Sequence, residues 1–319
     1  MSQPRILVIG NANVDLTSYV DVFPAKGETV LSSDFVIGMG GKGANQAVAC
    51  SRAGSPTALI GAVGNDAFGN LMWEGLSDES LDLTYLKRRD VPSGTATIMV
   101  DASGANQIAV FVGASGSITP DDAVTAITGL GSGRYFVSQL EISLDVVSAS
   151  LKHAKSRGMT TVVNTAPYRR MDQTFLDATD WIIANEGEAQ ALLSDTGLKA
   201  SVGEDPAQIL DQIASWSALL GVNLVITLGS GGAVGVSGGD ASFHAVAPSV
   251  TSIDTVGAGD CFTGYFVALM DQGFGWQQAM TGAVHAASHS VQSAGAQSSY
   301  PSPSQAEDFT AVAASTTVG

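Results

Sequence analysis

The stretch Asp254-Thr255-Val256-Gly257-Ala258-Gly259-Asp260 holds the residues best suited to chemistry. Its two glycines permit a tight turn, and the apolar run 261–270 that follows predicts a helix. A glycine-rich turn before a helix directs unpaired N–H groups and the positive end of the helix dipole at one point, which suits a phosphate. Asp260 falls in the first helical turn, where the dipole favours its ionised form, so it could accept a proton beside the anion.

A proton acceptor beside an anion site is the arrangement that phosphoryl transfer to an alcohol requires. The alternative interpretation is a plain glycine-rich connection in which Asp260 only caps the helix, since Gly and Asp are also ordinary loop residues.

A second glycine-rich stretch covers residues 38–49 and predicts a helix that ends near Gly54. It contains a formal G-x-G-x-x-G at Gly38, Gly40 and Gly43. The dinucleotide fingerprint belongs to the first strand–helix turn, which here would follow Gly10, so the match is weak. Two interpretations remain: bare backbone close to a small polar ligand that Lys42 and Asn45 also contact, or tight helix packing.

Polar residues also follow several predicted strands. Arg5–Gly10 is a short apolar run typical of a buried strand, and Asn13 and Asp15 come after it, where open α/β sheets place ligand-binding groups. An Asx turn is the alternative for this pair, and spacing alone favours it. Asn185-Glu186-Gly187-Glu188 follows the predicted strand Trp181–Ala184 and could hold Mg²⁺ through water, or merely begin a helix.

The elements that position these residues alternate between strand and helix along most of the chain, which predicts an α/β fold with a mostly parallel sheet. The predicted strands are 57–63, 135–140, 160–164 and a strand that runs into glycines over 224–232, and the predicted helices are 66–77, 120–130 and 144–157. Four extended segments do not join the alternation: 16–22, 28–37, 95–101 and 107–112. We expect them to form a small separate sheet that acts as a lid. The extended stretch 243–250 leads to the opening motif.

Composition limits the class of protein. The chain has 319 residues and 45% hydrophobic content, enough for one large domain with an insertion. The net charge of −16 argues against nucleic acid or an anionic membrane as a partner. With 14 Lys and Arg, a phosphate would have to be held by backbone amides and a divalent cation. Only two cysteines, no apolar leader and no long apolar run predict a soluble, unexported, cytoplasmic protein.

The two motifs, Gly40–Ala47 and Asp254–Asp260, resemble in this order and spacing the two signatures of the ribokinase-like (PfkB) carbohydrate kinases. The similarity extends over nearly the whole chain and is greatest to the ribokinase branch. It implies a three-layer α/β domain (1–14, 39–93 and 114–319) with a β-sheet lid (15–38 and 94–113). It also implies transfer of the γ-phosphate of ATP to the primary hydroxyl of a pentose such as D-ribose, and a homodimer formed by the lid sheets.

The resemblance implies a role for each matching residue. Asp260 would be the base, and the amides of Gly257, Ala258 and Gly259 the anion hole for the γ-phosphate. The sugar hydroxyls would contact Asn13, Asp15, Gly41, Lys42, Asn45 and Glu141. Asn185, Thr227 and Gly229 would lie along the nucleotide, and Glu188 would hold Mg²⁺ through water. A monovalent cation such as K⁺ would bind at Asp254, Val256, Ser290, Ser293, Gly295 and Ser299.

Several positions depart from the family pattern, which leaves the substrate open. Thr165, Ala184 and Ser298 stand where the family commonly has proline, and Ser115 stands where it has asparagine. The first alternative is a kinase of the same family that acts on deoxyribose, fructose or a nucleoside such as adenosine. Two further alternatives are an NAD-dependent oxidoreductase using the G-x-G-x-x-G match and a non-catalytic sugar-binding protein.

Overall fold

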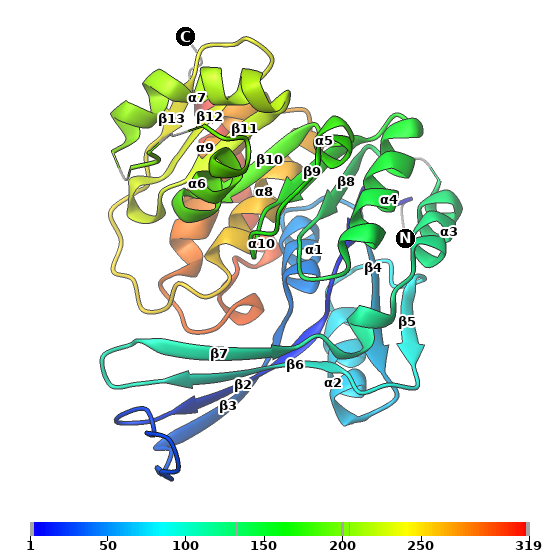
Figure 1. Ribbon diagram of the computed structural model, residues 1–319, viewed down its shortest axis with the longest axis vertical. Helices are drawn as coiled ribbons and strands as arrows, with labels where there is room; N and C mark the ends of the chain where they lie inside the picture. Colours follow the sequence, from blue (N-terminus) through cyan, green and yellow to red (C-terminus); the bar gives the residue numbers. More distant parts are fainter. Residues whose placement is uncertain (1–2, 132, 199–200, 204, 317–319) are drawn as a thin grey trace.

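The computed structural model describes residues 3–131, 133–198, 201–203 and 205–316. In these residues a nine-stranded sheet has the order β13-β12-β11-β10-β9-β8-β1-β4-β5 (Figure 1). Its strands are β1 (Ile6–Ile9), β4 (Thr57–Gly64), β5 (Leu86–Arg89), β8 (Tyr135–Ser138), β9 (Thr160–Asn164), β10 (Trp181–Asn185), β11 (Asn223–Thr227), β12 (Ala233–Val236) and β13 (Phe243–Ala245). Neighbours are parallel from β5 to β11, and β12 and β13 add an antiparallel edge.

Two layers of helices cover the sheet, one on each face, which confirms the predicted three-layer α/β fold (Figure 1). One layer contains α1 (Lys42–Arg52), α2 (Ala67–Ser77), α8 (Ala258–Asp271), α9 (Trp276–Ser290) and α10 (Pro303–Ser315). The other contains α3 (Pro120–Leu130), α4 (Leu144–Ser156), α5 (Gln173–Asp177), α6 (Glu186–Asp195) and α7 (Pro206–Leu220). The central strands are buried on both faces because helices lie on both sides, which explains their continuous apolar runs.

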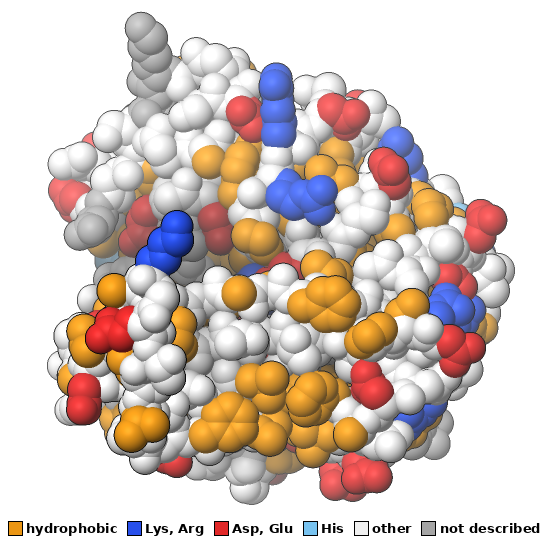
Figure 2. Space-filling model, turned by 60° about the horizontal axis from the view of Figure 1, so that its bottom comes forward, with side chains coloured by type: hydrophobic (Ala, Val, Ile, Leu, Met, Phe, Trp, Pro, Cys, Tyr) orange, Lys and Arg blue, Asp and Glu red, His pale blue; other side chains and the backbone are white. Residues whose placement is uncertain are grey.

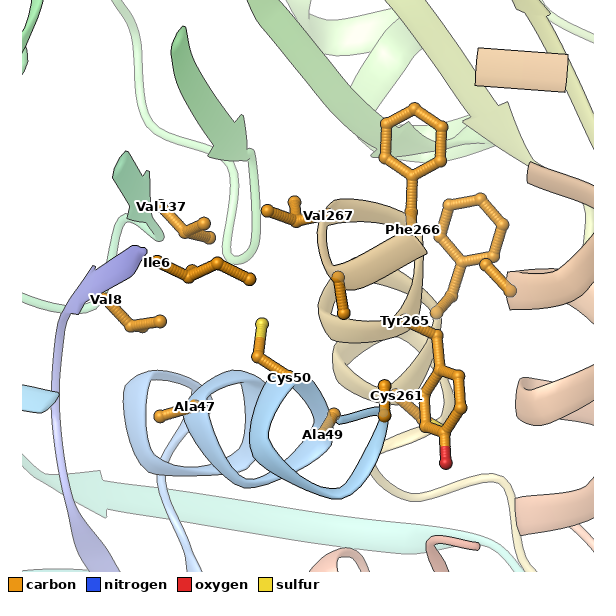
Figure 3. Close-up of a cluster of buried hydrophobic side chains, with 14 of the residues drawn as sticks. Ile6, Val8, Ala47, Ala49, Cys50, Val137, Cys261, Tyr265, Phe266 and Val267 are labelled. Carbon is orange, nitrogen blue, oxygen red and sulfur yellow. The ribbon is translucent and has the colours of Figure 1, made fainter. Parts of the chain in front are cut away.

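Helices α1 and α8 pack side by side against β1 and β8, as Figure 3 shows. Their close approach depends on Gly264, where a Cβ would lie 2.4 Å from Cβ of Ala49 and 2.8 Å from the carbonyl oxygen of Gln46. The Cys50 thiol also donates to the Gly264 carbonyl over 3.3 Å. This contact joins two segments more than 200 residues apart and brings the predicted sugar-binding motif beside Asp260.

A separate four-stranded sheet has the order β3-β2-β6-β7 and lies below the body in Figure 1. It is formed by β2 (Asn13–Tyr19), β3 (Asp34–Gly40), β6 (Gly94–Val100) and β7 (Asn106–Phe111), so both predicted excursions contribute to it. Several predicted bounds were wrong. Strand β2 spans Asn13–Tyr19 where residues 16–22 were expected, and β11 ends at Thr227, before the glycines. Residues 28–33 lie outside any strand, β13 ends at Ala245 instead of residue 250, and β8 ends at Ser138 instead of Leu140.

Within the described ranges, no helix is long and apolar enough to cross a membrane.

Candidate active site

Asp260 lies in the first turn of α8 and is 5% exposed. Each of its carboxylate oxygens accepts a hydrogen bond from a side-chain amide of α1: Asn45 Nδ2 reaches Oδ2 over 3.0 Å, and Gln46 Nε2 reaches Oδ1 over 2.8 Å. Two N–H donors, one on each oxygen, suit the carboxylate form. The Asp260 side chain is therefore turned toward Asn45, one of the predicted sugar-binding residues.

The turn before α8 is held in an unusual conformation. Gly257 is the N-cap of α8 and has a φ of 76°, in the left-handed region that favours glycine. Its carbonyl accepts a hydrogen bond of 2.9 Å from the buried Tyr300 hydroxyl, which fixes the turn to the segment after α9. A Cβ at Gly259 would meet no atom within 4 Å, so the backbone there faces open space. The amide of Ala258 is less available, since it makes a 3.3 Å bond to the Thr255 carbonyl.

Asn13 and Asp15 lie in strand β2, so the Asx turn that spacing favoured was wrong. The backbone of the second glycine-rich motif lies close to these two residues because glycine has no side chain in the way. A Cβ at Gly40 would lie 2.2 Å from Oδ2 of Asp15, and a Cβ at Gly43 would lie 2.6 Å from Cα of Gly10. Gly41 has a φ of 88°, and its carbonyl accepts from the Asn45 amide over 2.8 Å. Tight packing of the end of β3 and the start of α1 against β1 and β2 thus accounts for these glycines.

The predicted sugar-binding residues concentrate negative charge. Burial, with the charges of Glu141 and Asp260, raises the pKa of Asp15 from its ordinary value of 3.8 to about 7, against the effect of Lys42. Burial also raises the pKa of Glu141, although Lys42 opposes this shift. The charge of Asp260, with smaller contributions from Glu141, Glu188 and Asp15, raises the pKa of Lys42 despite burial. Lys42 is therefore a firmly protonated ammonium among four carboxyl groups.

Two adjoining cavities meet at the start of α8. A cavity of about 220 Å³ is lined by Lys42, Asn164, Ala166, Ile183, Asn185, Glu188, Thr227, Thr255, Gly257, Gly259 and Asp260. A larger cavity of about 580 Å³ extends past Gly229, Ser230 and Pro248 to Val291. Thr227, Thr255 and Gly259 line both cavities. The site can therefore hold a small polar group next to Asp260 and a larger ligand beyond it.

Asn185 and Glu188 form a capping box at the start of α6. Asn185 Oδ1 accepts from the Glu188 amide over 2.9 Å, and Glu188 Oε2 accepts from the Asn185 amide over 3.0 Å. The helix-start interpretation is therefore correct for both residues. Both also line the smaller cavity, so a carboxylate faces the place where phosphates would lie. No group of three His, Cys, Asp or Glu side chains is placed to hold a metal in the described part of the chain, so Mg²⁺ would need water and phosphate ligands as well.

The predicted monovalent-cation segments are joined by Asp254. Its Oδ1 accepts from the Val256 amide over 3.0 Å and its Oδ2 accepts from the Gly295 amide over 2.8 Å. The amides of Ile253 and Asp254 both donate to the Val291 carbonyl. These bonds bring residues 253–256 and 291–295 together beside the Gly257 turn. The oxygen-rich donor set (Asp254, Val256, Ser290, Ser293, Gly295 and Ser299) fits a hard cation.

The sequence analysis missed several residues that support the site. Asn11 donates to Glu141 Oε2 over 2.6 Å and accepts from the Gly43 amide over 3.3 Å, so it holds Glu141 in place. Gln297 donates to Asn45 Oδ1 over 2.9 Å. Asn11 and Gln46 stand beside predicted site residues in their motifs, and that adjacency was the available signal. Gln297 and Tyr300 likewise stand beside the predicted cation-site residues Gly295 and Ser299, but only the fold shows that they contact Asn45 and Gly257.

Comparison with known proteins gives a consistent result. The family model described as pfkB family carbohydrate kinase matches residues 3–303. The chain is 35% identical over 312 residues to a deoxyribokinase of Salmonella typhi, covering 95% of this chain and 98% of that protein. It is 33% identical over 305 residues to a ribokinase of Staphylococcus aureus (strain COL), covering 93% and 96%.

Solved structures agree with these relatives. The Arabidopsis thaliana ribokinase complexed with ribose and ATP superposes with a TM-score of 0.86 at 29% identity, covering 97% of this chain and 99% of that one. The ribokinase of Thermotoga maritima gives a TM-score of 0.84 at 29% identity, covering 95% and 98%. A cavity beside a buried aspartate at a helix N-terminus, a separate four-stranded sheet and a family match over residues 3–303 lead to one conclusion. The chain belongs to the pfkB family of carbohydrate kinases.

Proposed function

We propose that this kinase transfers the γ-phosphate of ATP to the primary hydroxyl of a pentose, and that the pentose is D-ribose. The position of Asp260 carries the proposal: it is buried between the α1 amides and the cavity that adjoins the Gly257–Gly259 turn. In this arrangement the sugar hydroxyl lies between the carboxylate and the terminal phosphate. ATP occupies the larger cavity along Thr227 and Gly229.

The chemistry is positioning together with charge stabilisation. A carboxylate is too weak a base to deprotonate a free alcohol, so the proton reaches Asp260 late, as the phosphoryl group loosens. The Gly257 and Gly259 amides and the α8 dipole stabilise the charge on the phosphoryl oxygens. When bound, Mg²⁺ at Glu188 and a monovalent cation at Asp254 would offset the negative charge of the phosphates. Cations are needed for this because the chain itself has a net charge of −16. Closure of the four-stranded lid would exclude water as a competing acceptor.

The polar groups on the sugar side support a hydroxyl-rich substrate. Asn13 is 2% exposed, and its Oδ1 accepts no hydrogen bond from the residues that the structure describes. A buried acceptor without a donor costs free energy, and a sugar hydroxyl would satisfy it. Asp15 and Glu141 offer further acceptors, while Lys42 offers a donor. A full set of pentose hydroxyls uses these groups better than a deoxy sugar does.

A deoxyribose kinase is the second candidate, because the chain is 35% identical to a deoxyribokinase. A panel of D-ribose, 2-deoxyribose, fructose and adenosine in a coupled assay for ADP separates the two candidates. We expect the highest kcat/KM with D-ribose, and an Asn13→Leu variant that loses the preference over 2-deoxyribose. Equal kcat/KM for the two pentoses would contradict the choice of ribose, and turnover with adenosine alone would contradict the choice of a sugar.

We also propose that two copies associate through the outer face of the lid sheet. Phe35 and Ile37 of β3 and Phe111 of β7 lie on one face of that sheet, because cross-strand partners share a face. They are 53%, 51% and 54% exposed. Figure 2, which looks at the molecule from this side, shows hydrophobic side chains gathered on the surface. An exposed apolar patch of this kind marks a contact surface.

A further inference from the structure

Gln46 lies between the Asp260 carboxylate and a chain of buried amides, and this contact extends the proposed function. Gln46 is fully buried in α1, one residue after Asn45. Its Nε2 donates to Oδ1 of Asp260 over 2.8 Å and to Oδ1 of Asn164 over 3.0 Å. Its Oε1 accepts from Nε2 of Gln139 over 2.6 Å. Both N–H groups of the Gln46 side chain and one lone pair of its oxygen thus make hydrogen bonds, which leaves only the second lone pair of that oxygen.

The orientation of the Gln46 amide follows from a backbone carbonyl. The carbonyl of Ile183 can only accept, so the Asn164 atom 3.1 Å away from it must be the nitrogen. Oδ1 of Asn164 must then face Gln46, and the Gln46 atom that it meets must be Nε2. The same nitrogen therefore faces Asp260. Reversing the amide would leave Asp260 and Asn164 facing an oxygen, with three acceptors together in a buried site.

We propose that Gln46 is the positioning residue for Asp260, presenting a donor of fixed direction that holds the carboxylate toward the sugar hydroxyl whose proton it accepts. Asn45 cannot do this alone, because it contacts Oδ2 and leaves Oδ1 free to rotate away. With both bonds in place, the two oxygens are fixed from the same helix turn. Positioning of this kind matters because a displacement of about 1 Å at a reacting group can cost about 100-fold in rate.

The first test compares two buried glutamines of the same network. Gln46→Met removes the donor to Asp260 and nearly keeps the volume, whereas Gln139→Met removes an amide that contacts Gln46 but does not donate to Asp260. We expect Gln46→Met to lower kcat by about 10- to 100-fold with the sugar KM within about three-fold, since Asn13, Asp15 and Lys42 remain. Gln139→Met should lose markedly less. Equal losses in the two variants, or an unchanged kcat in Gln46→Met, would overturn the proposal.

The second test uses the pH profile and serves also if Gln46→Met does not fold. Gln46→Glu keeps the shape but places a second carboxyl group against Oδ1, and two such groups share one proton. The acid limb of the kcat profile should then move up by at least about one pH unit. Other groups whose charges act on or respond to Asp260 are Asp15 of β2, Lys42 of α1, Glu141 after β8, Cys261 of α8 and Tyr300 after η3 (Gln297–Ser299).

These groups are the same in the wild-type protein and in Gln46→Glu, so a shift of the acid limb of the kcat profile would arise from position 46. An unshifted acid limb would overturn the proposal. The proposed function is tested by a separate outcome: it is refuted if the wild-type protein phosphorylates no pentose. Active wild-type protein with an unaffected Gln46→Met variant refutes only the role of Gln46.

Discussion

An asparagine at position 260 would have nearly the shape of the aspartate but could not accept the proton of the sugar hydroxyl. We therefore expect Asp260→Asn to keep the affinity for sugar and nucleotide while kcat falls by roughly 10²- to 10⁴-fold, the usual contribution of general-base assistance. Calorimetric binding of ribose and of an ATP analogue, together with turnover, measures both effects. A variant that retains wild-type turnover would rule out the base.

Asp15 links the site to stability. Its folded-state pKa of about 7 lies above the ordinary value of 3.8, so between these values the folded protein holds a proton that the unfolded chain has lost. The free energy of unfolding contributed by Asp15 therefore falls as pH rises from about 4 to 7 and is constant above. Asp15→Asn removes this dependence, so its Tm relative to wild type should rise by a few degrees, roughly, across that window. Thermal melts at several pH values measure this change in Tm, with Asp21→Asn, at an exposed position, as the control. Parallel curves of Tm against pH for the wild type and Asp15→Asn would contradict the prediction.

At the scale of elements, the turn before α8 depends on Gly257. An alanine there meets two costs: a left-handed φ of 76°, and a Cβ 2.7 Å from both Ala296 Cβ and the Tyr300 hydroxyl. Gly273, beyond the other end of α8, has a φ of 98° but no atom within 4 Å of a Cβ. Gly273→Ala therefore reports the backbone strain alone, about 1 to 2 kcal/mol.

Gly257→Ala should lose more stability than this control in urea denaturation and also raise the KM for ATP, because the turn proposed to face the phosphate must move. Gly273→Ala should leave the KM for ATP at the wild-type value. Equal denaturation midpoints and unchanged KM in both variants would show that the Gly257 turn tolerates a side chain.

The two glycine-rich motifs and the strand–helix alternation were predictable because they depend on local sequence. The helix α3, for example, was predicted with its observed bounds, since Thr119 and Asp122 form a capping box around Pro120. The placement of Asn13 in a strand was not predictable from spacing, because pairing with β3 and β6 decides it. The bond from Gln46 to Asp260 joins residues 214 positions apart. Such contacts depend on helix packing, here the α1–α8 contact at Gly264, which no local pattern encodes.

At the scale of the whole molecule, one strand serves both the site and the proposed dimer. Asp15 points to one face of the lid sheet and Leu16 to the other, because side chains alternate along β2. Ile37 pairs with Leu16 on the outer face, while Gly38 pairs with Asp15 on the opposite face, where we propose that the sugar binds. Association of two lids would therefore brace the sheet that carries Asn13 and Asp15, the proposed sugar-binding residues.

Ile37→Glu tests this coupling. Around a two-fold axis the substitution places like charges near one another in an apolar contact, so the dimer should dissociate in sedimentation velocity measurements at micromolar concentration. Leu219→Glu on α7 is the matched control, since Leu219 is 52% exposed and Ile37 is 51%. If the lid is braced by its partner, Ile37→Glu should also raise the KM for ribose more than it raises the KM for ATP, because the proposed sugar contacts are on β2 whereas the cavity proposed for the nucleotide lies in the body. A wild-type protein that sediments as a monomer, or an Ile37→Glu variant that remains dimeric, would contradict the proposal that the lid forms the dimer interface.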